Sequence, residues 1–256
     1  MSVAGPRLPP LLCPLTPGRA GTPCFLVPSA GTTPLSLVRL ARSIAPPRPV
    51  HAFAYAGLED DRPPHETLEA MAGAYVEELV AVAPHGPYLL SGHCLGGAVA
   101  LDMALRLEAR GARVSCLAML DSIAPLLATE GPGPGDAELP ATPDAFGPSL
   151  RSVLEGLVER TLRSYPALGP DVFERLRAML VLHVDAGVRY RARPVRAPVH
   201  LLQTGAADIP VDDRWTHIAA GVLTRRMVPG DTFSMLRPPH VEAVGRILGR
   251  VLEEHA

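Results

Sequence analysis

The chain has 256 residues, of which 47% are hydrophobic, and a formal net charge of −2 at pH 7. This length and composition suffice for one large domain with a substantial core. The nearly balanced charge excludes the strongly basic character of nucleic-acid-binding proteins, and no apolar run reaches the roughly 20 residues of a membrane span. We therefore expect a soluble protein that binds neither nucleic acid nor a membrane.

The N-terminal segment and the four cysteines both favour a cytoplasmic location. Residues 1–17 contain leucines, but prolines interrupt them, and the continuous apolar region of a secretory signal is missing. The cysteines have neither C-x-x-C spacing nor a neighbouring histidine cluster, so the sequence indicates neither a metal site nor a disulfide framework. The sequence also contains no lysine, which excludes Schiff-base chemistry on a lysine side chain.

Strands and helices are predicted to alternate along the chain. Short apolar runs predict strands, and longer segments with helical periodicity predict the helices between them. The predicted strands are 22–27, 50–55, 88–90, 114–120, 198–203 and 222–228, and the predicted helices are 34–44, 66–82, 95–110, 150–164, 170–188, a short one near Trp215, and 239–254. This alternation indicates an α/β protein with a mostly parallel central sheet flanked by helices.

Residues 124–188 depart from this alternation and indicate an insertion. A stretch rich in glycine and proline comes first, and two of the predicted helices follow it. An insertion at this place would overhang the edge of the sheet as a helical lid and shape the substrate chamber. We thus expect an N-terminal extension over residues 1–21 and one domain over residues 22–256, with the lid at about 124–188.

A G-x-C-x-G motif spans residues 92–96 and presents Cys94 between a predicted strand and a predicted helix. This arrangement is typical of a nucleophile elbow, in which small flanking residues relieve crowding around a strained backbone. At a helix N-terminus the dipole and the free N–H groups favour a thiolate. We interpret Cys94 as a nucleophile, although most isolated cysteines are small buried hydrophobic residues.

Three further positions fit a nucleophile of this kind. The loop after the first predicted strand would supply the N–H of Ala30, and the residue after the nucleophile the N–H of Leu95, to an oxyanion hole. Asp121 directly follows a buried strand, where a triad acid belongs. Asp208, just past a later strand, is the second choice for the acid. The alternatives are an ordinary strand-to-helix turn for Ala30 and a capping role for Asp121.

Together, several segments resemble the thioesterase domains of nonribosomal peptide and polyketide synthases, a branch of the α/β-hydrolase superfamily. The matching pieces are residues 87–97, 120–122, 189–194, Trp215, 229–236 and 238–241. The resemblance extends from about Pro23 to the C-terminus. It implies an α/β-hydrolase fold, no cofactor, and a partner that is an acyl or peptidyl carrier protein, whose phosphopantetheine arm delivers the substrate as a thioester in secondary metabolite biosynthesis.

The sequence departs from the family pattern at two positions. The family usually has serine where this chain has Cys94, and its catalytic histidine belongs where this chain has Thr232. The usual general base is therefore missing. Two other histidines are candidate replacements as base or acid, His183 in the predicted lid and His240 at the start of the last predicted helix.

Three hypotheses follow. The first is an enzyme that forms an acyl-Cys94 intermediate and releases its product by cyclisation or transfer rather than by fast hydrolysis. A thiol ionises more readily than a hydroxyl, whereas activating water normally needs a base that contributes roughly 10²–10⁴-fold. A carrier-to-carrier acyl or aminoacyltransferase is a variant of this hypothesis. The second is a catalytically degenerate scaffold that docks a carrier protein, and the third is an esterase for free small molecules.

Overall fold

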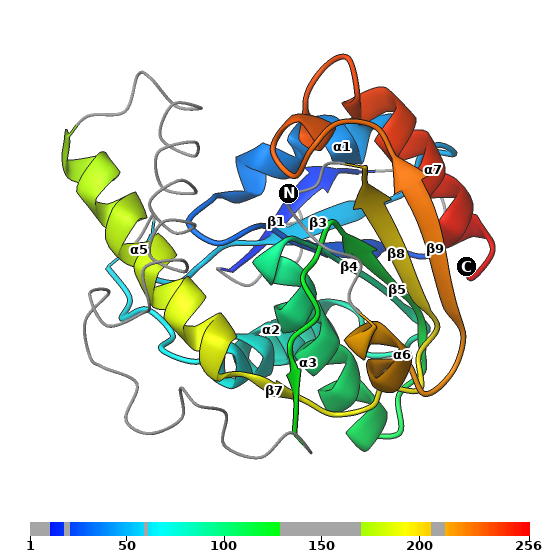
Figure 1. Ribbon diagram of the computed structural model, residues 1–256, viewed down its shortest axis with the longest axis horizontal. Helices are drawn as coiled ribbons and strands as arrows, with labels where there is room; N and C mark the ends of the chain where they lie inside the picture. The colour runs from blue at the N-terminus through cyan, green and yellow to red at the C-terminus, as the bar shows by residue number, and fades with distance from the viewer. Residues whose placement is uncertain (1–10, 18–20, 59–60, 129–169, 206–212) are drawn as a thin grey trace, which may run out of the picture.

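The computed structural model describes residues 11–17, 21–58, 61–128, 170–205 and 213–256 (Figure 1). Asp208, the predicted helix 150–164 and most of the predicted lid lie outside these residues. In the described part of the chain, no helix is long and apolar enough to cross a membrane.

A seven-stranded sheet forms the centre of the protein. Its strands are β1 (Leu12–Thr16), β2 (Cys24–Val27), β3 (Val50–Phe53), β4 (Tyr88–His93), β5 (Val114–Leu120), β8 (Val199–Thr204) and β9 (Leu223–Val228). They lie in the order β1-β3-β2-β4-β5-β8-β9. Only β1 is antiparallel to its neighbour in this sheet, so the carboxyl ends of the other six strands share one edge.

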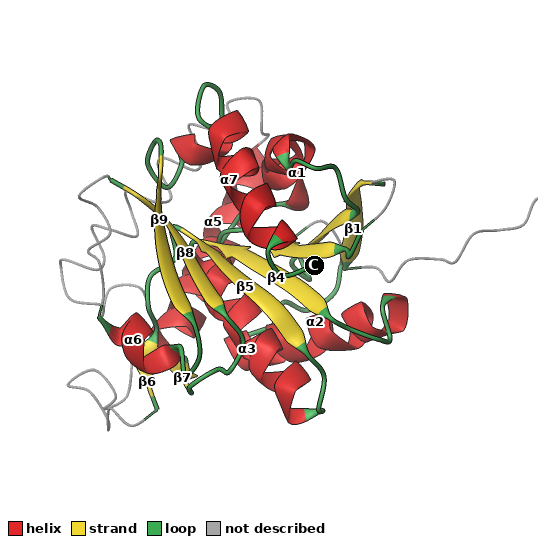
Figure 2. Ribbon diagram, turned by 90° about the vertical axis from the view of Figure 1, so that its right-hand side faces the viewer, coloured by secondary structure: helices red, strands yellow, loops and turns green. Residues whose placement is uncertain are grey.

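Helices cover both faces of the sheet. Helix α1 (Val38–Ser43), which follows the short η1 (Pro34–Leu37), and helix α7 (Val241–Glu253) lie on one face, and α2 (Leu68–Val82) and α3 (Leu95–Ala109) on the other (Figure 2). Successive strand residues point to opposite faces, so Leu89 packs in the α1/α7 layer and Leu90 in the α2/α3 layer. The sheet thus separates two apolar cores.

The remaining elements lie around this framework. Helix α5 (Pro170–Arg189) packs against α2 and α3, and α6 (Arg214–Ile218) and η3 (Ser234–Leu236) flank β9 in the chain (Figure 1). A second, two-stranded sheet pairs β6 (Leu126–Leu127) with β7 (Arg191–Ala192) in parallel. These short strands join the two ends of the predicted lid.

The observed fold agrees with the α/β architecture expected from the sequence, and each predicted strand has a counterpart within a few residues. The sequence pattern did not predict the short strands β6 and β7 or the strand β1, and β1 lies inside the segment assigned to an N-terminal extension, residues 1–21. Its pairing with β3 is irregular between Pro14 and Thr16, and proline is tolerated in an edge strand of this kind. The sheet therefore begins ahead of residue 22.

A buried hydrogen-bond network ties the end of α5 to α3. The hydroxyl of Tyr190 donates to Oδ1 of Asp102 over 3.2 Å, and Nε of Arg106 donates to Oδ2 of the same carboxylate over 2.6 Å. Tyr190 and Asp102 are both buried. The motif around Tyr190 thus anchors the chain where it returns from the lid to the sheet.

We expect Tyr190→Phe to lower the free energy of unfolding by roughly 1–3 kcal/mol, because a buried carboxylate oxygen loses its donor. Urea denaturation measures this change. Ser43→Ala is the control, since it removes an exposed hydrogen bond to the Arg39 carbonyl and should stay within about 0.5 kcal/mol of the wild type. Equal effects of the two substitutions would contradict the anchoring role.

Candidate active site

Cys94 occupies the sharp turn between β4 and α3. Its φ of 52° and ψ of −119° lie in a region that side chains other than glycine rarely adopt, which costs on the order of 1–3 kcal/mol. Two backbone hydrogen bonds hold this conformation: the Cys94 N–H donates to the carbonyl of Leu120 over 2.9 Å, and its carbonyl accepts from the N–H of Gly97 over 3.1 Å. The turn has the geometry of a nucleophile elbow.

The two glycines of the motif are required by backbone crowding. A Cβ on Gly92 would lie 2.2 Å from the carbonyl oxygen of Gly96. A Cβ on Gly96 would lie 2.4 Å from the carbonyl oxygens of both Val27 and Pro28. The elbow therefore contacts the end of β2 directly, which brings the loop after β2 beside Cys94.

The two predicted oxyanion donors lie on adjoining segments, Leu95 at the start of α3 and Ala30 in the loop after β2. The N–H of Leu95 donates to the sulfur of Cys94, and Ala30 is buried in the adjacent loop. No acceptor among the described residues takes the N–H of Ala30. The arrangement is compatible with both groups binding a carbonyl oxygen attacked by Cys94, and that role stays a prediction.

The pKa of the Cys94 thiol is raised above its usual value, chiefly because burial penalises the thiolate. Hydrogen bonds from the Ser29 hydroxyl and the Leu95 N–H act in the opposite direction, and the nearby charge of Asp121 adds to the rise. The N–H at the helix N-terminus favours the thiolate, as expected, but desolvation outweighs the two donors, so the net shift of the pKa is upward. Near neutral pH the side chain is a thiol that must lose its proton as it reacts.

The carboxylate of Asp121 is buried and receives three hydrogen bonds. Its Oδ1 accepts from the N–H of Thr204 over 2.9 Å and from the Thr204 hydroxyl over 3.0 Å. Its Oδ2 accepts from the hydroxyl of Thr232. The structure therefore places the predicted acid beside the residue at the usual histidine position, and the threonine hydroxyl occupies the place on the carboxylate where an imidazole N–H would bind.

His93 also binds the segment that carries Thr232. Its Nε2 lies 2.8 Å from the carbonyl oxygen of Thr232 and donates to it. Burial lowers the pKa of His93, so the ring is neutral near pH 7. His93 thus ties the end of β4 to the loop after β9, and no hydrogen bond among the described residues joins its ring to the sulfur of Cys94.

Neither candidate histidine makes a hydrogen bond to Cys94 in the part of the chain that the structure describes. The ring of His183 binds the loop after β2, where its Nδ1 accepts from the N–H of Gly31 over 3.3 Å. His240 precedes α7 and lies beside Gly230, and no hydrogen bond among the described residues joins its ring to Cys94 or Asp121. Asp208 lies outside the described residues.

Three residues that sequence reasoning missed complete the site. Ser29 donates to the sulfur, Thr204 saturates one oxygen of Asp121, and the hydroxyl of Ser122 donates to the carbonyl of Gly92 over 3.3 Å. Ser29 adjoins Ala30 and Ser122 adjoins Asp121, so proximity to predicted residues was an available signal. For Thr204 the signal was its position at the end of a strand beside β5.

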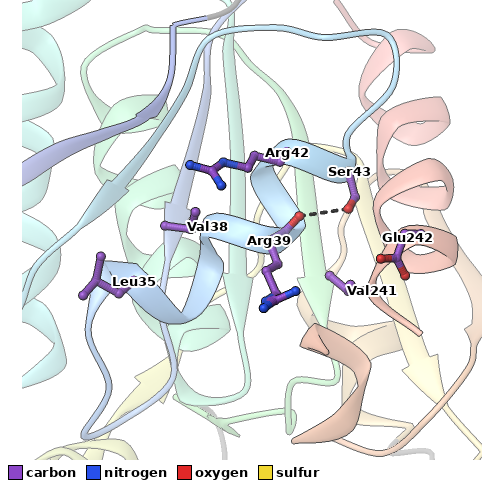
Figure 3. A pocket seen from close by; sticks show the side chains of 7 residues that line it. All are labelled: Leu35, Val38, Arg39, Arg42, Ser43, Val241 and Glu242. Carbon is purple, nitrogen blue, oxygen red and sulfur yellow. Dashed lines mark hydrogen bonds between the residues drawn. The ribbon is translucent and has the colours of Figure 1, made fainter. Parts of the chain in front are cut away.

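A separate pocket of about 510 Å³ lies between α1 and α7 (Figure 3). It is lined by Leu35, Val38, Arg39, Arg42, Ser43, Val241 and Glu242. None of these residues belongs to the candidate active site.

The parallel sheet, the elbow and the acid after β5 define an α/β-hydrolase. The sequence model of the thioesterase domain matches residues 22–252. The chain therefore belongs to the thioesterase domain family.

Known proteins with similar sequences and structures support this assignment. The chain is 27% identical to a probable non-canonical nonribosomal peptide synthetase, CymA, of Salinispora arenicola, in an alignment of 263 positions that covers 96% of this chain. It is 38% identical over 97 residues to the nonribosomal peptide synthetase btyA of Aspergillus terreus. These matches span 3% and 10% of the two synthetases. A structure of the Vlm2 thioesterase domain bound with a dodecadepsipeptide superimposes with a TM-score of 0.70 and 27% identity, covering 93% of this chain and 96% of that one.

We expect the rate of Cys94 alkylation by iodoacetamide to increase with pH into the alkaline range, because only the thiolate reacts. Ser29→Ala should move this profile to higher pH, since it removes a donor that stabilises the thiolate. Peptide-resolved mass spectrometry separates Cys94 from the partly buried Cys13. Ser43→Ala should leave the profile unchanged, and an unshifted profile in Ser29→Ala would show that the hydroxyl does not act on the sulfur.

Proposed function

We propose that this protein acts on acyl or peptidyl thioesters carried by the phosphopantetheine arm of a carrier protein in nonribosomal peptide or polyketide biosynthesis. Cys94 would form a covalent acyl intermediate, and the product would leave by cyclisation or by transfer rather than by fast hydrolysis. Membership in the thioesterase domain family and the similarity to synthetase domains support the substrate class.

The hydrogen bond from Thr232 to Asp121 supports the second part of this proposal, which is release by cyclisation or transfer rather than by fast hydrolysis. A triad acid normally orients a histidine that removes a proton from the nucleophile and later from water. Here a hydroxyl that is a poor base at neutral pH takes that place, and the sulfur receives donors instead of facing a base. A site of this kind is better suited to exchange between thiols than to activation of water.

The first step, acylation of Cys94, is balanced in atoms and charge without a histidine. The Cys94 sulfur attacks the thioester carbonyl, and the N–H groups of Ala30 and Leu95 stabilise the negative oxygen of the tetrahedral intermediate. The bond from carbonyl carbon to pantetheine sulfur then breaks, and the proton lost by Cys94 ends on the departing thiol through solvent. One thioester replaces another, so the acyl group stays activated for an amine, a hydroxyl or a second thiol.

We expect a mass increase equal to one acyl group when the purified protein is mixed with a panel of acyl-pantetheine and acyl-carrier thioesters. Intact-protein mass spectrometry detects this adduct, and Cys94→Ala should abolish it. Added thiol, amine or hydroxyl acceptors then identify the group that removes the acyl chain. If no thioester yields an adduct or is consumed, the covalent mechanism is wrong and the scaffold hypothesis takes its place.

Thr232→His should increase hydrolysis of the acyl-enzyme by at least about tenfold, since a general base contributes roughly 10²–10⁴-fold. Deacylation in buffer, followed by mass spectrometry, measures this rate. Thr232→Val is the matched control, because it removes the hydroxyl without adding a base. Asp121→Asn should abolish the gain in the Thr232→His background, and a gain that survives this change would contradict the role of Asp121.

A further inference from the structure

Helix α5 contacts the loop after β2 and the side chain of Leu95, which belong to the two segments that carry the candidate oxyanion donors. Leu180, His183 and Gly187 are spaced by three and four residues and therefore share one face. A Cβ on Gly31 would lie 2.8 Å from Cβ of Leu180, and a Cβ on Gly187 would lie 2.4 Å from Cδ1 of Leu95. The helix is thus in close contact with the loop that carries Ala30 and with the first residue of α3.

His183 makes the polar contact in this interface. Its Nδ1 accepts from the N–H of Gly31 over 3.3 Å, and its side chain is only 1% exposed. A nitrogen that accepts a hydrogen bond has no proton, so the neutral ring has its proton on Nε2. Burial lowers the pKa of His183 to about 3, which keeps the ring in this neutral form throughout the physiological range.

The segment 28–31 is held from two sides. The Tyr55 hydroxyl donates to the carbonyl of Pro28 over 2.6 Å at its beginning, and His183 accepts from Gly31 at its end. The rings of Tyr55 and His183 contact each other, with centroids 4.0 Å apart. Of the successive N–H groups of Ala30 and Gly31, that of Gly31 donates to His183, and that of Ala30 has no acceptor among the described residues.

We propose that His183 is a positioning residue that sets the oxyanion hole by accepting the Gly31 N–H and so orienting the neighbouring N–H of Ala30 toward the carbonyl attacked by Cys94. The inference rests on the proposed function, because an oxyanion hole matters only if Cys94 is acylated. It also couples α5 to catalysis, since a shift of this helix would release the loop. His183 then acts through Ala30 and takes no proton from the nucleophile.

Two substitutions at this position test the proposal. His183→Phe keeps a ring beside Tyr55 but removes the acceptor, and we expect it to slow acylation of Cys94 by about 10- to 100-fold, less than the roughly 10²–10³-fold of losing an oxyanion donor outright. In His183→Asn the amide oxygen replaces Nδ1 as acceptor, so this variant should recover most of the rate. His217→Phe, which replaces an exposed histidine of α6, is the control and should match the wild type.

Alkylation by iodoacetamide separates positioning from general damage. This reaction forms no oxyanion, so its rate at Cys94 should be the same in the wild type and in His183→Phe. Equal acylation rates in these two proteins, or equal losses of acylation and alkylation, would overturn the proposal.

If even the wild type forms no acyl adduct, the proposed function fails. Hydrogen exchange at residues 29–32 then tests whether His183 holds this loop. Faster exchange at the Gly31 amide in His183→Phe, but not in His183→Asn, supports the inference, and unchanged exchange refutes it.

Discussion

The site depends on the close approach of three backbone segments at Gly96. The first turn of α3 touches the carbonyl oxygens at the end of β2, and Gly92 faces the carbonyl of Gly96 from the end of β4. Any side chain at these two glycines would separate the loop after β2 from α3, and with it the N–H of Ala30 from that of Leu95. This contact involves only backbone atoms, so it does not depend on whether residue 94 is serine or cysteine. The scaffold for the oxyanion hole can therefore be kept while the chemistry of the nucleophile changes.

Threonine at position 232, where the family resemblance predicts a histidine, leaves neither oxygen of Asp121 without a hydrogen-bond donor. A buried carboxylate without donors is strongly destabilising, yet Asp121 has its two oxygens satisfied by Thr204 and Thr232. These bonds join the end of β5 to β8 and to the loop after β9. His93 reinforces the same loop through the carbonyl of Thr232. These hydrogen bonds link neighbouring strand ends, which explains how the fold accommodates threonine at position 232.

The reactivity of Cys94 reflects a balance between burial and hydrogen bonding. A helix N-terminus stabilises an anion by about 0.3–1 kcal/mol, which is less than one pKa unit, whereas burial shifts the pKa of an acidic group by up to several units. Burial therefore sets the direction of the shift, and the donors from Ser29 and Leu95 only reduce it. A thiol with a raised pKa forms less of the thiolate on which oxidation and alkylation depend near neutral pH.

Local sequence determined the class of fold and the position of Cys94 at a sharp turn between a strand and a helix. Apolar runs alternating with helical periodicity indicated the parallel sheet, and the glycines around Cys94 required an elbow, because both signals depend on neighbouring residues alone. The sequence did not predict the edge strand β1, because its proline interrupts the apolar pattern and because its pairing with β3 is a contact between distant segments. The partners of Asp121, the bond from Ser29 to the sulfur and the contact of His183 with Gly31 join residues up to 152 positions apart. Only the tertiary structure decided these, because hydrogen bonding and desolvation depend on distances that the folded chain alone establishes.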